Sequence, residues 1–402
     1  MIHQIFLQIA ILLSVAILFG AIAKRLGFPA VMGEIIGGIL LGPSLFGYLF
    51  PHAFGLVFSS ATEIVLVRET FIKLGLLLFL FCSGAELNFS QLRVHKKSWA
   101  AISIAGFMIP FLLGVGGYYL WPNIWDVPPQ TSAFKFSLFC GVALSISAIP
   151  VISKILLDLK LLQTLTGGLT LSVAAMHDVI GWAIFGFIVQ DNQSQIHQNV
   201  WIVALFIVLL ALALWSESWF QEQAAGEDSD TGITGSPVLI GPMIVGILAA
   251  SFLMEQAGIH GVLGAFVLGI VWGRNPKLAN ARESLMKVAV NFFVPIYFVS
   301  IGLKTNFTEH FSPMLAAWVL FLACFGKISG ALLGGKIGGM DSRQSLRIGY
   351  ALNARGAMEI VIATIALDHG IISHTLFVAL VFMAIATSLM SGPLIRSTFK
   401  RT

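Results

Sequence analysis

Thirteen apolar stretches, nearly all of them long enough to cross a bilayer as a helix, dominate this sequence of 402 residues. A span needs about 20 apolar residues, and its backbone must satisfy its own hydrogen bonds. The stretches fall at 4–23, 29–47, 66–87, 97–120, 134–157, 166–190, 199–215, 237–256, 260–275, 285–303, 312–335, 345–368 and 374–395. The sequence therefore predicts an all-α, polytopic membrane protein of about 13 helices. Because 260–275 is short and 54–65 is borderline, counts of 12 and 14 stay open.

Charged residues are scarce and unevenly placed. They make up 10% of the chain, against roughly 25% in soluble domains. With 13 spans, 17 of the 23 lysines and arginines fall on one side, and four fall on the other. Because basic loops favour the cytoplasm, we expect the N-terminus outside and the C-terminus inside a bacterial-type inner membrane. The basic residues form no stripe that would indicate nucleic-acid binding.

The two halves of the chain resemble one another. MGEIIGGILLG (32–42) matches LGAFVLGIVWG (263–273), GAELNF (84–89) matches GLKTNF (302–307), and GVALS (141–145) matches GYALN (349–353). The matches keep their order and define a repeat of five spans. Its two copies start seven spans apart, which is an odd number, so we expect inverted repeats. Such repeats are typical of transporters, with the substrate site at the midplane.

Two spans at equivalent positions of the repeats carry residues that interrupt a helix. The fifth span has Pro150 among serines that include Ser147, a candidate ion-binding residue. The twelfth span has Asn353, Arg355 and Gly356 in the matching place. Proline removes a backbone donor and clashes with the preceding turn. Paired breaks in inverted halves indicate an ion or substrate site, although a kink and a snorkelling arginine would explain each break separately.

Asp178 lies near the middle of the sixth span, in LSVAAMHDVIGWAIF. A carboxylate at this depth costs roughly 2.5–3.5 kcal/mol on insertion scales. It can be protonated and neutral, or ionised and holding a cation, which is the chemistry of cation/proton exchange. We therefore predict that Asp178 binds a monovalent cation and a proton in turn. The alternative is an ion pair that only ties helices together, and such pairs rarely repay their desolvation.

Two basic residues accompany this aspartate. His177 is either a second titrating or cation-tuning group of the ion site, or a neutral imidazole packed or hydrogen-bonded on another face. For direct proton transport the neutral imidazole is favoured. Lys327 lies in the eleventh span and could pair with Asp178 when no cation is bound, which is the favoured reading. The alternative is a fixed positive charge that offsets the carbonyls of a helix end. Lys327 borders a strip of glycines that lets another helix approach closely: Gly326, Gly330, Gly334 and Gly338.

Three further charged residues lie near the predicted breaks. Arg355 and Glu359 are four apart and could meet on one helix face, and Lys154 occupies the matching region of the fifth span. We interpret all three chiefly as compensating the partial charges of broken helix ends.

Enzyme signatures are missing from the sequence. It contains no H-E-x-x-H, no G-x-S-x-G and no phosphate-binding loop. Its three cysteines lie in separate apolar segments, without the spacing of a disulfide framework or a metal centre. We therefore expect a protein that is not an enzyme and that needs no cofactor.

Seven motifs together resemble one family, the second branch of the monovalent cation/proton antiporter superfamily. They are GEIIGGILLGPSLFG, LGLLLFLFCSGAEL, ALSISAIPVISKIL, MHDVIGW, VPIYFVSIGLKTNF, GKISGALLGG and LNARGAMEIV. The resemblance covers nearly the whole chain. It implies two broken helices that cross beside the aspartate, a homodimer, and a core that moves up and down against a dimer-forming panel.

By this resemblance the family's essential aspartate maps onto Asp178 and its buried lysine onto Lys327. The residue before the aspartate is commonly Asp in electrogenic members and Asn or Gln in electroneutral ones, so His177 is a departure. The implied domains are panel helices, core helices of each repeat, and a linker with an acidic loop. Their boundaries are 1–96 and 237–310 for the panel, 97–191 and 311–402 for the core, and 192–236 for the linker.

The sequence thus favours a secondary antiporter that exchanges Na+ or K+ for H+, one for one and without net charge movement. A sodium-coupled symporter of an organic anion is a second hypothesis, because it would use the same inverted-repeat architecture. A membrane sensor or channel subunit that does not transport is a third.

Overall fold

In the computed structural model, every regular element within the described residues is a helix. The structure describes residues 2–58, 62–86, 96–162, 164–189, 239–256, 260–273, 275 and 278–399. Packing divides the chain into two compact units. The first comprises residues 1–5, 60–87 and 189–297, and the second comprises 6–59, 88–188 and 298–402.

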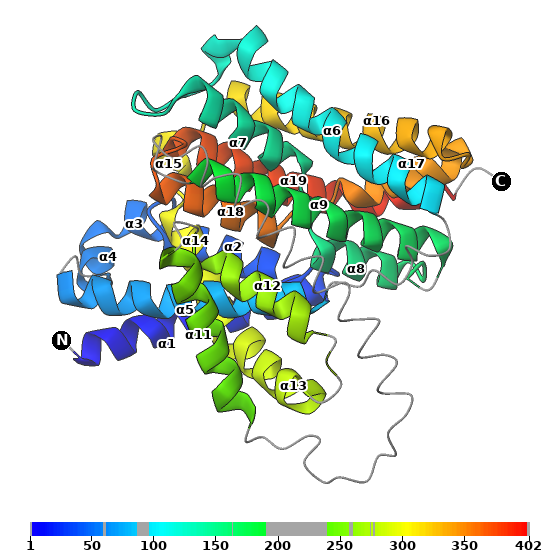
Figure 1. The fold of residues 1–402 in the computed structure, drawn as a ribbon. Coiled ribbons are helices and arrows are strands. Elements are labelled where there is room, and N and C mark those ends of the chain that lie inside the picture. Colours follow the sequence, from blue (N-terminus) through cyan, green and yellow to red (C-terminus); the bar gives the residue numbers. More distant parts are fainter. Residues whose placement is uncertain are drawn as a thin grey trace, which may run out of the picture. The chain divides into compact units, whose positions relative to one another are not determined.

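The second unit holds most of the helices (Figure 1). They are α1 (Ile2–Arg25, beyond its first residues), α2 (Ala30–Leu41), α3 (Phe46–Leu49), α4 (Pro51–Val57), α6 (Lys96–Leu120), the 3-10 turn η2 (Pro122–Ile124), α7 (Ala133–Ser145), α8 (Ile149–Asp158), α9 (Leu165–Val189), α15 (Phe307–His310), α16 (Pro313–Ile337), α17 (Ser342–Leu352), α18 (Ala357–Asp368) and α19 (His374–Ser397).

The first unit is smaller. It contains α5 (Thr62–Glu86), α11 (Ile240–Gln256), α12 (Val262–Trp272), α13 (Ala279–Val288) and the π-helical turn η5 (Ala289–Phe293). The helix α14 (Val294–Lys304) continues from η5 and runs into the second unit.

Twelve of the thirteen predicted spans coincide with these helices, and the thirteenth, 199–215, lies outside the described residues. Among the described residues, eight helical segments are long and apolar enough to cross a membrane, and the bent pair α17–α18 raises this to nine. The predicted all-α, polytopic fold is confirmed, while the count of thirteen stays a prediction.

Polar residues at helix starts explain several boundaries in the second unit. Ser132, Ser312, Asp341 and Ser373 each accept a hydrogen bond from a backbone N–H in the first turn of the helix that follows. Those N–H groups have no partner within the helix, so a capping side chain marks where the helix begins.

The predicted glycine strip packs α16 against α6, and Figure 1 shows the two helices side by side. A Cβ atom at Gly330 would lie 2.7 Å from the Ala105 carbonyl oxygen, and one at Gly338 would lie 2.6 Å from Ser98 Cα. Later residues of α16 therefore meet earlier residues of α6, so the helices are antiparallel. Because they occupy equivalent places in the two repeats, this direction supports the predicted inversion.

A second repeat feature appears once in each unit. In the second unit, Gly302 of α14 packs its Cα against the backbone of Ile35 and Ile39 of α2. In the first unit, Gly84 of α5 packs in the same way against Phe266 and Ile270 of α12. In the alignment of the two repeats, Gly84 corresponds to Gly302, Ile35 to Phe266 and Ile39 to Ile270. Each copy therefore contributes its glycine-rich helix to a contact with the other copy.

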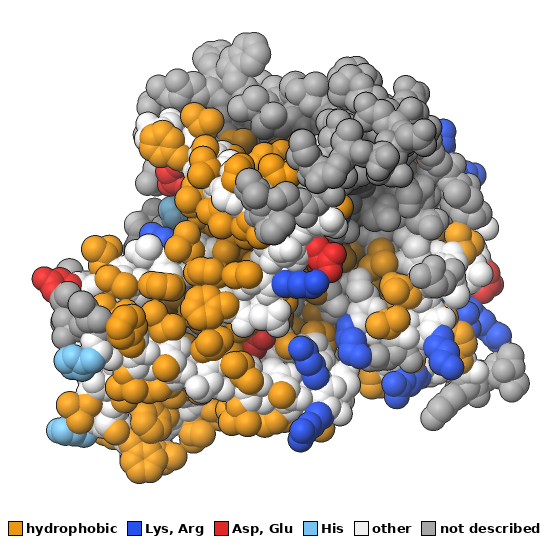
Figure 2. Space-filling view, turned by 90° about the horizontal axis from the view of Figure 1, so that it is seen from below, with side chains coloured by type: hydrophobic (Ala, Val, Ile, Leu, Met, Phe, Trp, Pro, Cys, Tyr) orange, Lys and Arg blue, Asp and Glu red, His pale blue; other side chains and the backbone are white. Residues whose placement is uncertain are grey.

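Large apolar side chains lie on the surface of several helices, while some charged side chains are buried. Figure 2 shows hydrophobic side chains over much of the described part of one face. On α16, Phe321, Phe325 and Leu333 are exposed while Lys327 is fully buried. A helix with this distribution suits a lipid environment and not a water-facing surface.

Several basic residues of the second unit gather at neighbouring helix ends. Ser98, near the start of α6, donates to the Gly338 carbonyl at the end of α16 (3.0 Å), and Arg347 of α17 donates to Thr398 beyond α19 (3.0 Å). These contacts bring together the ends that carry Lys96, Lys97, Lys336, Arg343 and Arg396. The predicted linker 192–236 lies outside the described residues, and the predicted panel and core boundaries stay a prediction.

We expect Gly330→Val to destabilise the protein by about 1–3 kcal/mol, because its side chain must enter the α6 backbone. The measurement is thermal unfolding of the purified protein in detergent. Gly116→Ala is the matched control, since a Cβ at Gly116 has open space within 4 Å. Equal melting temperatures for Gly330→Val and the wild type would contradict the close packing.

Candidate ion-binding site

Two helices of the second unit are broken at the predicted positions. α7 ends at Ser145 and α8 begins at Ile149, with Pro150 in its first turn, where no backbone donor is needed. α17 ends at Leu352, and α18 begins at Ala357 with a bend of 46° between them. Each break frees backbone groups that need new partners at membrane depth.

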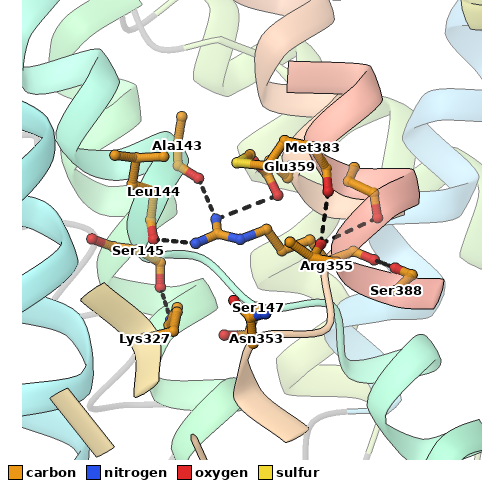
Figure 3. Close-up of polar contacts among 12 residues, drawn as sticks. Ala143, Leu144, Ser145, Ser147, Lys327, Asn353, Arg355, Glu359, Met383 and Ser388 are labelled. Carbon is orange, nitrogen blue, oxygen red and sulfur yellow. Dashed lines mark hydrogen bonds and ion pairs between the residues drawn. The ribbon is translucent and has the colours of Figure 1, made fainter. Parts of the chain in front are cut away.

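The two breaks supply partners for each other where they cross (Figure 3). The Ala148 N–H donates to the Ala354 carbonyl (3.1 Å), and the Ser147 hydroxyl donates to the Leu352 carbonyl (2.8 Å). Gly356 lies just before α18, where a Cβ would come within 2.9 Å of Val151 Cγ2 in α8. The chain thus brings residues about 200 positions apart into direct contact.

Arg355 closes the end of α7 from the opposite break, as Figure 3 shows. Its guanidinium donates to the Ala143 carbonyl (2.8 Å) and to the Leu144 carbonyl (2.6 Å). These carbonyls belong to the last turn of α7, whose unpaired oxygens carry partial negative charge. Arg355 also lies 3.5 Å from the Glu359 carboxylate in the first turn of α18, and both side chains are buried. The guanidinium of Arg355 thus faces both the α7 carbonyls and the Glu359 carboxylate, which is the arrangement that charge compensation at a broken helix end requires.

Lys327 closes the same helix end from α16. Its ammonium donates to the Ser145 carbonyl and lies 3.0 Å from Nδ1 of His177 on α9. Nε2 of the same imidazole lies 3.1 Å from the Ser103 carbonyl of α6. Lys327 and His177 are fully buried, so one polar chain links α16, α9, α6 and α7.

Asp178 follows His177 on α9 and is also fully buried. Neither of its carboxylate oxygens has a hydrogen-bond partner among the described residues. The charge of Lys327 acts on this carboxylate, but within the described part of the chain no ion pair joins the two. A buried carboxylate without a partner is costly as an anion, so it needs either a proton or a cation.

Two predicted residues remain, Asn353 and Lys154. The Asn353 amide donates to Cys324 Sγ (3.3 Å), while its Oδ1 has no hydrogen-bond partner within the described residues. Lys154 lies in α8 and is half-buried, so its predicted compensating role stays a prediction.

Sequence reasoning missed several groups that hold the site together. Ser388 of α19 donates to the Arg355 carbonyl, and Ser103 contributes only a backbone oxygen. The small polar residues of TSLMS were a weak signal for Ser388. No residue type could have indicated the carbonyls of Ala143, Leu144 and Ser103.

We expect Arg355→Met to destabilise the protein by about 3–5 kcal/mol, because it leaves Glu359 buried without its counter-charge. The double variant Arg355→Met/Glu359→Met recovers part of this loss but not all, since the α7 carbonyls still lack their donors. Denaturation of the purified protein in detergent measures both. A double variant less stable than Arg355→Met would contradict the pairing.

Comparison with known proteins agrees with this architecture. Residues 11–401 match the family model described as "Sodium/hydrogen exchanger, transmembrane". The chain is 34% identical to Cation/H(+) antiporter 17 of Arabidopsis thaliana over 98% of its own length and 48% of that protein. It is 28% identical to the Na(+)/H(+) antiporter NhaS4 of Synechocystis sp., over 96% of this chain and 95% of that one.

The fold also resembles a solved structure, the sodium proton antiporter MjNhaP1 from Methanocaldococcus jannaschii. The TM-score is 0.64 at 15% identity, with 99% of both chains covered, so this likeness concerns the fold alone. The chain spans about half the length of the plant relative it matches. With the family model covering nearly the whole chain, the family resemblance noted in the sequence is confirmed, and this chain belongs to the transmembrane sodium/hydrogen exchanger family.

Proposed function

We propose that this chain is a secondary antiporter that exchanges Na+ or K+ for H+ across a membrane. The observation that carries the proposal is Asp178, a fully buried carboxylate with no hydrogen-bond partner in the described structure. It lies in the same compact unit as the two crossed helix breaks. The names of the relatives, which are cation/proton and Na(+)/H(+) antiporters, support the choice of substrates.

Exchange follows from the fact that H+ and a cation need the same carboxylate. When Asp178 is protonated it is neutral and tolerates burial, and when it is ionised it provides a ligand for a monovalent cation. Backbone carbonyls of the breaks at 145–150 and 353–356 would supply further oxygens. Lys327 would compete with the cation for the ionised aspartate, because its charge already acts on Asp178.

The stoichiometry in this proposal is one cation for one proton. Glu359, the other buried acid near the crossing, faces Arg355 at 3.5 Å and is thereby committed to a structural pair. Asp178 is then the carboxylate that changes its ligand, and each exchange moves no net charge.

Access would alternate by a movement of the helices that carry the site against the dimer-forming panel. The side chains of the site belong to one compact unit, which also contains residues 6–59 of the predicted panel. The chain would form a homodimer in a bacterial-type inner membrane. The helix ends rich in lysine and arginine would face the cytoplasm, with the N-terminus outside and the C-terminus inside.

Asp178→Asn should abolish cation-dependent proton movement, because an amide can neither be protonated in this way nor neutralise a cation. The measurement is dequenching of a pH-sensitive dye in proteoliposomes after addition of Na+ or K+. Asp368→Asn is the control, because Asp368 is an exposed aspartate paired with Lys304 (3.1 Å). Retained exchange in Asp178→Asn would remove this mechanism.

The exchange rate should not depend on membrane voltage if one cation is exchanged for one proton. We expect equal initial Na+/H+ exchange rates with the voltage clamped and unclamped. Net movement of one elementary charge across 100 mV would be worth roughly 2.3 kcal/mol and would change the rate. A rate that rises several-fold with an imposed potential would show net charge movement. Repeating the assay with K+ and Li+ identifies the preferred cation.

A further inference from the structure

The Lys327 ammonium is held by a backbone carbonyl and by an imidazole. It has three N–H donors, of which one reaches the Ser145 carbonyl and one reaches His177 Nδ1 at 3.0 Å. Asp178, the neighbour of His177 in sequence, keeps both oxygens without a hydrogen-bond partner among the described residues. Lys327 is thus hydrogen-bonded to the His177 imidazole, although the Asp178 carboxylate is close enough to interact with its charge.

The partners of the imidazole identify its tautomer. Nε2 faces the Ser103 carbonyl at 3.1 Å, and a carbonyl oxygen can only accept a hydrogen bond. Nε2 therefore carries the ring hydrogen. In the neutral ring Nδ1 is left with its lone pair, which accepts a hydrogen bond from Lys327.

The imidazole is held in place by α6. The Phe107 ring lies 5.8 Å from it, between centroids. A Cβ atom at Gly106 would lie 3.2 Å from His177 Cε1 and 3.5 Å from Nε2, so the absence of a side chain there makes room for the ring. The acceptor that Lys327 meets is therefore a fixed one.

Adjacent residues on a helix point in directions about 100° apart. A lysine bonded to His177 is therefore aimed at a different face of α9 from the one that carries Asp178. Arg355 and Glu359 also act on the Lys327 charge, but they are paired with each other at 3.5 Å. His177 is the side chain that holds the ammonium to one side of the carboxylate.

We propose that His177 is a positioning residue that keeps the Lys327 ammonium off Asp178 and so raises the affinity of Asp178 for the transported cation. This inference rests on the proposed function. A cation binds only when the carboxylate is free of the lysine, so its apparent affinity scales with the fraction of protein in that state. Loss of the His177 acceptor releases the lysine to compete.

Cation binding is measured as the rise in thermal stability of the purified protein with increasing Na+ or K+. His177→Phe keeps a ring but has no acceptor, and we expect it to weaken binding about ten- to hundredfold, the effect of one hydrogen bond to a charged group. His177→Asn places an oxygen near the position of Nδ1, and we expect it to bind like the wild type. Unchanged affinity in His177→Phe overturns the proposal.

A lysine-free background separates positioning from general structural damage. In Lys327→Met, adding His177→Phe should leave the cation affinity unchanged, because no ammonium remains to be positioned. If His177→Phe weakens binding by the same factor with and without Lys327, the histidine acts independently of the lysine and the proposal is wrong.

If the His177→Phe protein does not fold and cannot be purified, a milder variant tests the same point. Gly106→Ala pushes the imidazole through a Cβ contact of 3.2 Å and should weaken cation binding in the same Lys327-dependent way. Gly116→Ala, on the same helix but with open space around its Cβ, should not. Equal affinities for these two alanine variants would count against the proposal.

The variant Asp178→Asn separates failure of the positioning role of His177 from failure of the proposed antiport function. If that variant still shows cation-dependent stabilisation, the proposed function fails and the inference fails with it. If stabilisation disappears in Asp178→Asn while His177→Phe binds normally, the proposed function stands and only the positioning role of His177 is overturned.

Discussion

The structure depends on one constraint, that no backbone polar group can be left unpaired at membrane depth. Two helices of this chain stop and restart in apolar surroundings, which frees carbonyls at the end of one segment and N–H groups at the start of the next. The breaks satisfy part of this demand themselves, through the bonds from Ala148 to Ala354 and from Ser147 to Leu352. The rest requires charged donors.

These charged donors, Arg355 and Lys327, determine which buried charge is left available to bind an ion. Arg355 and Lys327 both bind carbonyls in the last turn of α7, and each is also satisfied by a second group, Glu359 or His177. With both cations engaged at the helix end, Asp178 is left without a partner among the described residues. Structural charges and the exchanging charge are thus separated, although they lie in one buried network.

Much of this could be predicted from residue types. Asp178, Lys327, Arg355 and Glu359 stand out because charge is rare in apolar spans, and Pro150 and Gly356 mark breaks because they interrupt a helix. The family likeness and the all-helical fold are confirmed by the comparisons. The glycine strip indicated close approach, and the structure identifies α6 as the partner.

The individual contacts could not be predicted, because they depend on how helices are rotated and on backbone atoms that every residue shares. Lys327 was expected to pair with Asp178 in the absence of a cation, or else to offset the carbonyls of a helix end. In this structure it bonds the Ser145 carbonyl at the end of α7, and His177, which was not expected as its partner. His177 was expected either as a titrating or cation-tuning group or as a neutral imidazole on another face. It is held by Ser103 of α6, which contributes only its carbonyl and so leaves no trace in the sequence.

The central claim is that one proton and one cation compete for Asp178. The most direct measurement is proton release by the purified protein, in weak buffer at constant pH, when Na+ or K+ is added. The account predicts release of up to about one proton per chain in the wild type and none in Asp178→Asn, since a bound cation displaces the proton that neutralised the buried carboxylate. Cation binding without proton release in the wild type, or undiminished release in Asp178→Asn, would contradict it.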